Sequence, residues 1–413
     1  MKFVVAHTGA RRGYAVPAIL ERAGLLERFY TDICADVGLG RLICAAAKLG
    51  FKHPESRRLS TRRLPPNLIG KTKTFSVPNL KMYLSGARYG ETEAVFRAHL
   101  KWQCELGTKM AQAGFGEARW LHSFLDEFPT LIIAAKERGL KVVSEIYILL
   151  SADRLLRDER RDFPGWEPGT PDVGKIQTEM LGEHVLLTRS DFALCPSEAV
   201  LEDLVRNFHF RRDRAMVVPY GVSDEWLKVR NEPVRGRVLF VGAADLRKGI
   251  HYLALAAEKL KARDSRYEFR VAGNVHEGVS SQELCAPLNF LGRIPRDKTA
   301  AEFAAADVFV LPSLAEGSAG ATYEALASGV PVVATPEAGS VVRDGVEGRI
   351  VPSRDPDALA EAITEIIEDR EKRDRMAAAA SERAKEFTWD RYRERLVSAL
   401  TAFGEYAPPQ PKR

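Results

Sequence analysis

The sequence predicts an α/β protein of two domains, each with a parallel β-sheet. The chain has 413 residues, more than one hydrophobic core usually organises. Apolar strand-like runs alternate with helical segments, and a polar, proline-containing linker at residues 231–237 separates two such series. We place the first domain at residues 1–220 and the second at 221–388, followed by a helix at 389–406 and a disordered proline-rich tail at 407–413.

The composition is that of an ordinary globular protein, with 45% hydrophobic and 28% charged residues. A net charge of +5 does not indicate nucleic acid as a partner. The five cysteines have no metal-binding spacing and their number is odd, which favours free thiols in a reducing compartment. Nothing at the N-terminus resembles a signal peptide, and no uncharged apolar run approaches the roughly 20 residues that span a bilayer. We therefore expect a cytoplasmic protein.

The first half opens with a buried-type strand at residues 1–7, a loop at 8–17 and a helix at 18–28. Gly9 and Gly13 would let the loop backbone approach a phosphate, or would simply form a tight strand-to-helix turn. The other elements expected in this half are helices at 92–114, 130–138, 178–189 and from 196 onward, and strands at 119–124, 141–144, 191–195 and 215–219.

A basic stretch interrupts this half between Lys52 and Lys73. It carries seven lysines and arginines against Glu55 alone, and its prolines and glycine break any helix. We expect an irregular surface loop. Its charge is either that of a solvated loop or that of a surface attracted to anionic lipid headgroups or to a phosphate-bearing acceptor.

The second half repeats the alternation. Strands are expected at residues 238–242, 267–272, 289–292, 306–311, 330–334 and 349–351, and helices at 250–262, 299–305, 355–369 and 371–386.

Two glutamates eight residues apart give this half its clearest chemistry. Glu316 lies in a glycine-containing loop after the strand at 306–311, and Glu324 lies in a short helix closed by Gly329. Ligands of parallel α/β units bind at the carboxyl ends of strands, so both carboxylates would face a crevice. Carboxylates accept hydrogen bonds from vicinal hydroxyls, and the amides of 318–320 at the helix start suit an anion. Hydroxyls beside phosphates describe a nucleotide sugar.

Six motifs follow one another in the second half. They are Phe240-Val-Gly242 with Lys248-Gly249, Phe290-Leu-Gly292, Ala306–Ser313, the E-x7-E pair Glu316 and Glu324, Ala325–Val333, and Gly339 with Asp344-Gly345 and Gly348. Together they resemble the retaining glycosyltransferases of family 4, with the GT-B fold of two Rossmann-like domains facing a cleft. The resemblance covers roughly residues 190–400. It implies that the first domain binds the acceptor, that the second binds the donor, and that the helix at 389–406 crosses back to the first domain.

The resemblance also implies roles for single residues. Glu324 would hold the ribose hydroxyls of the nucleotide, Glu316 the donor sugar, and Lys248 would stabilise the charge that develops on the departing diphosphate. Ala243 stands where the family usually has an arginine, so Arg247 would approach the diphosphate from a different direction. The implied donor-binding residues are Glu324, Gly242, Arg247, Gly317, Ser318, Ala319, Gly320 and Gly13.

Two residues of the first half complete the predicted site. His122 is expected to end a strand facing the cleft, where family members often have a histidine near the donor sugar; the alternative is a packed histidine. With Lys248 and Glu316 it forms the predicted catalytic set. Glu145 also ends a strand and would bind the acceptor, or would be a polar loop residue without that role.

The predicted function is transfer of a sugar, with retention, from a nucleotide sugar to a glycan, lipid-linked or small-molecule acceptor, as in polysaccharide biosynthesis. No metal or other cofactor is expected. Residues 52–73 would make peripheral contact with an anionic membrane at its inner face. The alternatives are a catalytically weak nucleotide- or sugar-binding GT-B protein, which the alanine at 243 favours, and a nucleotide-sugar epimerase.

Overall fold

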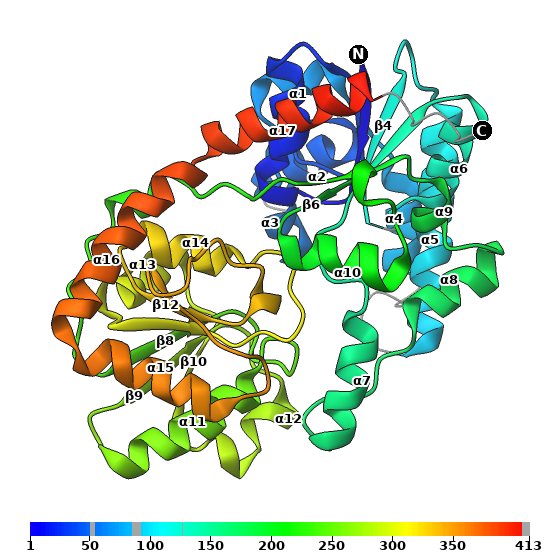
Figure 1. Cartoon of the computed structure of the whole chain (residues 1–413). Helices are drawn as coiled ribbons and strands as arrows, with labels where there is room; N and C mark the ends of the chain where they lie inside the picture. The colour runs from blue at the N-terminus through cyan, green and yellow to red at the C-terminus, as the bar shows by residue number, and fades with distance from the viewer. Residues whose placement is uncertain (50–53, 85–91, 126, 407–413) are drawn as a thin grey trace, which may run out of the picture.

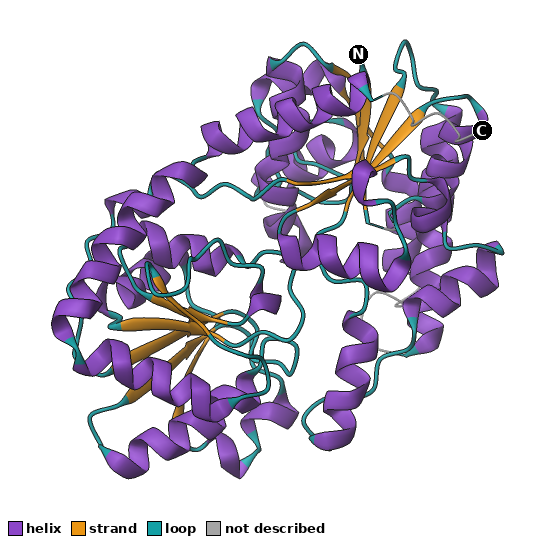
Figure 2. Ribbon diagram, in the orientation of Figure 1, coloured by secondary structure: helices purple, strands orange, loops and turns teal. Residues whose placement is uncertain are grey.

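The computed structural model describes residues 1–49, 54–84, 92–125 and 127–406. They form two sheets in which every paired strand is parallel to its neighbour, each surrounded by helices (Figures 1 and 2). The predicted architecture of two parallel-sheet domains is therefore confirmed. The predicted tail at 407–413 lies outside the described residues, and the domain boundaries remain predictions.

The first sheet has seven strands. In spatial order they are β3 (Thr72–Thr74), β2 (Leu26–Thr31), β1 (Phe3–Ala6), β4 (Trp120–Phe124), β5 (Lys141–Glu145), β6 (Phe192–Cys195) and β7 (Ala215–Val217). The helices of this half are α1 (Ala15–Arg22), α2 (Gly38–Lys48), α3 (Pro54–Ser60), α4 (Ser76–Leu84), α5 (Glu93–Gln112), α6 (Pro129–Glu137), α7 (Ala152–Asp162), α8 (Val173–Leu181), α9 (Val185–Arg189) and α10 (Glu198–Phe208).

The second sheet has six strands. In spatial order they are β10 (Leu288–Gly292), β9 (Glu268–Ala272), β8 (Arg237–Val241), β11 (Val308–Leu311), β12 (Val332–Ala334) and β13 (Gly348–Ile350). Its helices are α11 (Ile250–Arg263), α12 (Glu277–Ser280), α13 (Arg296–Ala305), α14 (Gly320–Ala327), α15 (Pro356–Glu368) and α16 (Arg370–Ala384).

Continuous apolar runs explain the central strands. Every residue of β1, β11 and β12 is buried, as expected for parallel strands covered by helices on both faces. The last helix, α17 (Trp389–Glu405), leaves the second domain and packs on the first (Figure 1), where Phe403 stacks on Phe192 with ring centroids 4.5 Å apart. The predicted return of the C-terminal helix is confirmed.

Three expectations for the first half are wrong in detail. Leu26–Thr31 forms strand β2 rather than the end of the first helix. The basic stretch is not an irregular loop, since it holds helix α3, a 3-10 turn at Pro66–Lys71 and edge strand β3; residues 50–53 lie outside the described part. The helix expected at 178–189 is two helices, because Gly182 adopts a left-handed conformation between them. No helix in the described ranges has both the length and the apolar character needed to cross a bilayer.

Candidate functional site

The strand order of the second sheet reverses between β8 and β11. These two strands are adjacent, with Val308 paired to Val238, yet the next strand along the chain after each lies on opposite sides. Such a switch point leaves a crevice at the carboxyl ends of the strands, where ligands of open α/β sheets bind. The turn after β8, residues 242–249, and the loop after β11, residues 312–319, border this crevice.

The side chains of Lys248 and Arg247 converge on Glu316. The Lys248 ammonium nitrogen lies 2.5 Å from Oε1 of Glu316, and the Arg247 guanidinium donates to the same oxygen and to the Ala315 carbonyl at 3.2 Å. Burial alone would raise the pKa of Glu316, but the two cations outweigh it and hold the pKa below its ordinary value. The site therefore contains an ionised carboxylate with two cations, and Arg247 points at the same group as Lys248.

Two glycines in the β8–α11 turn allow close contacts, one with the Lys248 side chain and one with the loop after β11. Gly242 has φ +151°, and a Cβ there would lie 2.9 Å from Cδ of Lys248. Gly249 has φ +71°, and a Cβ there would collide with the Pro312 carbonyl. The backbone amide of Lys248 donates to Asp245 at 2.8 Å. The lysine is therefore fixed at its backbone and given room along its side chain.

Glu324 lies on α14 with its side chain half-buried and with no hydrogen bond or ion pair to any residue in the described ranges. Burial raises the pKa of this carboxyl from 4.5 to about 7, and the charge of Arg296 offsets only part of that effect. A carboxyl group without a partner in the described part of the chain has its hydrogen-bonding capacity available to a ligand.

The loop between the two glutamates is fixed largely by its own contacts. Ser318 Oγ lies 2.8 Å from the Tyr323 hydroxyl and donates to the Gly339 carbonyl at 2.9 Å. The Ala319 amide donates to the Ala338 carbonyl at 3.2 Å, so it is not available to an anion as the sequence suggested. Within the described part of the chain, the amides of Gly317, Ser318 and Gly320 have no acceptor.

The same loop touches the first domain. Ser197 Oγ donates to the Gly317 carbonyl at 2.5 Å, and a side chain at Gly317 would collide with the Tyr147 carbonyl. Tyr147 follows β5, and the guanidinium of Arg11 lies 4.6 Å from its ring centroid. The two domains therefore meet at Gly317, where the loop between the two glutamates begins.

His122 does not end its strand. It is the third of five residues in β4, its side chain is fully buried, and neither ring nitrogen has a hydrogen-bond partner in the part of the chain that the structure describes. Burial lowers its pKa to about 4, so the ring is neutral at pH 7, and Phe124 lies beside it with ring centroids 5.1 Å apart. The expected position facing the cleft is wrong, because side chains on both faces of a central parallel strand are covered. Its contact with a donor sugar stays a prediction.

Glu145 does end a strand, β5, and Oε1 of its carboxylate is already paired, whereas Oε2 has no hydrogen-bond partner among the described residues. Arg12 pairs with it at 2.6 Å, the Tyr220 hydroxyl donates to it at 3.2 Å, and His122 Nε2 lies 3.9 Å away. The Arg12 guanidinium also lies 3.2 Å from the centroid of the Tyr220 ring. Burial acts to raise the pKa of Glu145, and Arg12 with its neighbours lowers it overall. Glu145 is thus ionised and buried, and its ion pair holds the side chain of Arg12 in place.

The backbone conformation of the turn that carries Arg12 explains why position 13 is a glycine. Arg12, Gly13 and Tyr14 have φ values of +46°, +63° and +65°, so three consecutive residues adopt left-handed conformations. A Cβ at Gly13 would meet nothing within 4 Å. The glycine serves a tight strand-to-helix turn that aims Arg12 at Glu145; a phosphate contact by Gly13 stays a prediction. No pattern in the sequence indicates this pair, whose residues lie 133 positions apart.

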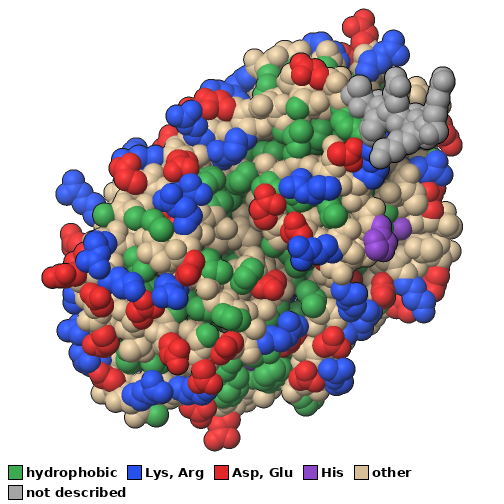
Figure 3. All heavy atoms as spheres, viewed as in Figure 1, with side chains coloured by type: hydrophobic (Ala, Val, Ile, Leu, Met, Phe, Trp, Pro, Cys, Tyr) green, Lys and Arg blue, Asp and Glu red, His purple; other side chains and the backbone are tan. Residues whose placement is uncertain are grey.

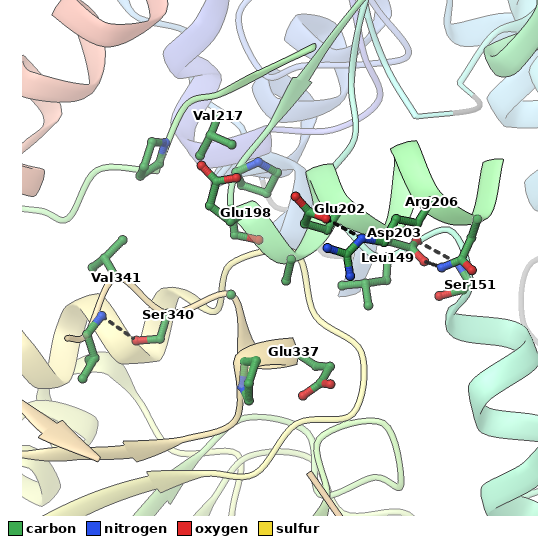
Figure 4. Close-up of a pocket in the computed structure, with 18 of the residues that line it drawn as sticks. Leu149, Ser151, Glu198, Glu202, Asp203, Arg206, Val217, Glu337, Ser340 and Val341 are labelled. Atoms are coloured by element: carbon green, nitrogen blue, oxygen red, sulfur yellow. Dashed lines mark hydrogen bonds and ion pairs between the residues drawn. The ribbon is translucent and has the colours of Figure 1, made fainter. Parts of the chain in front are cut away.

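Two cavities lie near these groups. One of 830 Å³ separates the start of α10 from the loop at residues 336–343 (Figure 4), where Ser340 Oγ accepts from the Val342 amide at 3.2 Å. None of Lys248, Glu316 and Glu324 lines it. The other, of 370 Å³, lies within the first domain. Its lining includes Thr8, Arg11, Gln103, Glu127, Tyr147 and Gln177.

On the face shown in Figure 3, acidic and basic side chains are interspersed.

Residues 224–383 match the model of the family described as Glycosyl transferases group 1. The D-inositol 3-phosphate glycosyltransferase of Geodermatophilus obscurus is 30% identical over 261 residues, covering 57% of each chain. The phosphatidyl-myo-inositol mannosyltransferase of Mycolicibacterium smegmatis is 37% identical over 165 residues, covering 38% of this chain and 43% of that protein. The chain spans 57–63% of the length of the first three relatives it matches.

Solved structures share the whole fold at low identity. Sucrose-phosphate synthase from Thermosynechococcus elongatus has a TM-score of 0.65 at 18% identity, covering 98% of this chain and 100% of that one. Anabaena HepE in complex with UDP and glucose has a TM-score of 0.61 at 15% identity, covering 97% and 100%. The two-sheet architecture is thus the GT-B fold. Residues 224–383 are thus similar to glycosyl transferases of group 1, and the whole chain shares its fold with these solved structures.

Proposed function

We propose that this protein transfers a sugar from a nucleotide-sugar donor to a hydroxyl of an acceptor, with retention, as in family 4. The observation that carries the proposal is the arrangement at the β8/β11 switch point. Lys248 and Arg247 converge on the buried carboxylate of Glu316, and Glu324 lies half-buried without a partner among the described residues. This arrangement supplies cations for a diphosphate and carboxylates for hydroxyls.

In the proposed step, the bond between C1 of the sugar and the diphosphate oxygen breaks. The acceptor oxygen forms its bond to C1 on the same face, and its proton passes to the departing phosphate oxygen. The leaving group gains negative charge as the bond breaks, so Lys248 and Arg247 stabilise the transition state more than the bound donor. Glu316 holds their side chains in place before the donor binds and accepts hydrogen bonds from the sugar.

We further propose that transfer needs no metal, since two cationic side chains meet at the turn that would face the diphosphate. Turnover that is unchanged by EDTA and by added Mg²⁺ is the expected result. Turnover that EDTA abolishes and Mg²⁺ restores would contradict this part of the proposal.

We propose that the acceptor binds to the first domain. We also propose that the protein is cytoplasmic and contacts the inner face of an anionic membrane. The supporting observation is an apolar outer surface on α2: Leu42 and Leu49 are 66% and 82% exposed, and Leu39 lies on the same face. Val77 of α4, which packs against α2, is also exposed. The exposed cations around this surface are Arg41, Arg58, Arg63 and Lys73. Exposed leucines bordered by cations suit the interface of an anionic bilayer.

Vesicle sedimentation tests this contact. Binding to vesicles with anionic lipid should fall with salt and with Leu42→Glu, whereas Met180→Glu, at an exposed apolar residue of α8, should leave it unchanged. Equal binding of both variants, or no binding by the wild type, would contradict membrane contact and leave sugar transfer standing.

A turnover assay with a panel of nucleotide sugars and a mixture of hydroxyl acceptors tests the function itself. Release of nucleoside diphosphate together with a new glycoside is expected. Nucleotide binding without release or transfer would favour a binding protein. Recovery of the nucleotide sugar with one sugar stereocentre inverted would favour an epimerase.

A further inference from the structure

A segment of the first domain reaches across to the second. Helix α7 and the turn after it, residues 152–167, leave the end of β5 and lie against the second domain beside α11 and α12 (Figure 1). We call this segment the strap. We propose that the strap positions the β8–α11 turn that carries Arg247 and Lys248, and that Glu167 is the positioning residue. This inference rests on the proposed function of that turn.

The carboxylate of Glu167 is hydrogen-bonded directly to the turn. Its Oε1 accepts a hydrogen bond from the backbone amide of Leu246 at 2.6 Å. The side chain of Glu167 is 11% exposed, and its other oxygen lies 3.5 Å from Arg160 of the strap. Leu246 is buried and directly precedes the two cationic residues. The first domain thus fixes the backbone of the turn at the position where the cationic side chains begin.

A second carboxylate holds the start of α11, the helix that follows the turn. Glu159 of α7 is buried, and it lies 3.0 Å from Nε2 of His251 and accepts from the Tyr252 hydroxyl at 3.1 Å. Arg354 of the second domain pairs with its other oxygen. His251 and Tyr252 are the second and third residues of α11, the helix that starts where the turn ends. Carboxylates of the opposite domain therefore hold the middle of the turn and the start of the helix that follows it.

Aromatic side chains of the strap pack against aromatic side chains of α11. The ring centroid of Phe163 lies 4.4 Å from that of His251 and 5.8 Å from that of Tyr252. The ring centroid of Trp166 lies 5.7 Å from that of His251. Trp166 is 4% exposed. Its carbonyl comes so close to α12 that a Cβ at Gly278 would lie only 2.5 Å from it. Backbone at that distance leaves no room for a side chain, so the two domains are closely packed here.

The consequence is a link between domain closure and the cationic turn. When the domains meet, the Leu246 amide has its acceptor and the start of α11 is held. When they separate, the amide loses Glu167, and Arg247 and Lys248 lose the support that aims them at the crevice. Charge stabilisation depends on groups held in place before the reaction. The turn therefore reaches its working geometry only in the closed arrangement, which also excludes water from the reaction.

Four variants test this link. Glu167→Ala removes the acceptor, and Glu167→Gln keeps an oxygen that can take the same hydrogen bond. Gly278→Ala drives the strap away from the second domain without touching the turn. Asp158→Ala is the matched control, because Asp158 lies on α7 but is 58% exposed and, among the described residues, pairs only with Arg161 of the same helix.

The first readout is hydrogen exchange of the protein alone, followed by mass spectrometry of peptides covering residues 243–252. Exchange there should speed up about tenfold in Glu167→Ala and Gly278→Ala, the size expected for the loss of one hydrogen bond. Exchange should stay at the wild-type rate in Glu167→Gln and Asp158→Ala. Unchanged exchange in both Glu167→Ala and Gly278→Ala would overturn the positioning role without involving any ligand.

The second readout is turnover of a nucleotide sugar that the wild type uses. In Glu167→Ala, kcat should fall about tenfold with KM for the donor changed less than twofold, and Glu167→Gln should recover most of the loss. Faster exchange with an unchanged kcat would overturn the proposal. If the wild type transfers no sugar at all, the proposed function fails, and the exchange experiment alone decides whether the strap holds the turn.

Discussion

Lys248 and Glu316 form an ion pair of 2.5 Å between the turn after β8 and the loop after β11, with both side chains 13% exposed. This pair joins the two chain segments that border the crevice at the switch point of the second sheet. It places a cation where a diphosphate would lie and a carboxylate where a sugar would lie.

Replacing Lys248 by alanine should lower kcat far more than it weakens donor binding. The lysine opposes charge that appears as the diphosphate departs, so most of its effect is expected in the transition state. A fall of about 10²–10³ in kcat is the scale for losing one such group. Lys259→Ala, at a lysine of α11 that pairs with Asp357, should leave kcat unchanged. Equal turnover in the two variants would remove Lys248 from the reaction.

Glu324→Ala should weaken binding of a nucleoside diphosphate by about 1–3 kcal/mol, the range for hydrogen bonds to a charged group. The carboxylate has no partner in the described part of the chain, so its loss leaves little else disturbed. Calorimetric titration with UDP and GDP measures the effect. Glu361→Ala, on the exposed surface of α15, is the control. If Glu324→Ala binds as tightly as the control, Glu324 is not part of the nucleotide site.

The same carboxyl should make folding stability depend on pH. Its pKa of about 7 in the folded protein exceeds the value of 4.5 for a free group, so the folded state binds the proton more tightly. That contribution is complete below pH 4.5 and is lost as the pH rises through 7. Glu324→Gln cannot ionise, so it should be more stable than the wild type by about 3 kcal/mol at pH 8 and of nearly equal stability at pH 4.5. Denaturant unfolding at both pH values measures this, and a gap that does not grow with pH contradicts the raised pKa.

Glu145→Ala should destabilise the first domain by about 3–5 kcal/mol, because it leaves the Arg12 guanidinium without its buried counter-charge. Glu183→Ala breaks an ion pair with Arg189 that is more exposed and should cost no more than about 1 kcal/mol. Urea unfolding compares the two. Similar losses for both variants would show that the Arg12–Glu145 pair is not structurally important.

The second half of the fold was largely predictable because its strands are short and apolar and lie next to prolines or glycines, as in Val308–Leu311, which Pro312 follows, and Val332–Ala334, which Pro331 precedes. In the first half, β2 was missed because Leu26-Glu-Arg-Phe-Tyr-Thr31 carries two charges and follows a helix after only three residues. Edge strand β3 is three polar residues, which no periodicity can reveal.

The site was predictable where it depends on local motifs and not where it depends on distant contacts. The positions of Lys248, Glu316 and Glu324 at one switch point follow from strand order and turns. His122 was misplaced because the pattern Trp-Leu-His-Ser-Phe does not show where the strand ends. The Arg12–Glu145 pair and the Glu167–Leu246 hydrogen bond join residues 133 and 79 positions apart, so only the folded chain reveals them.

The most direct test of sugar transfer at this crevice is NMR of the reaction product at its anomeric centre. Wild-type protein would be incubated with a nucleotide sugar that it cleaves and with a hydroxyl acceptor that it uses. The predicted result is a new glycosidic bond with the same anomeric configuration as the donor, formed at a strongly reduced rate by Lys248→Ala. A product of inverted configuration, or bound nucleotide with no transferred sugar, would contradict the proposed reaction.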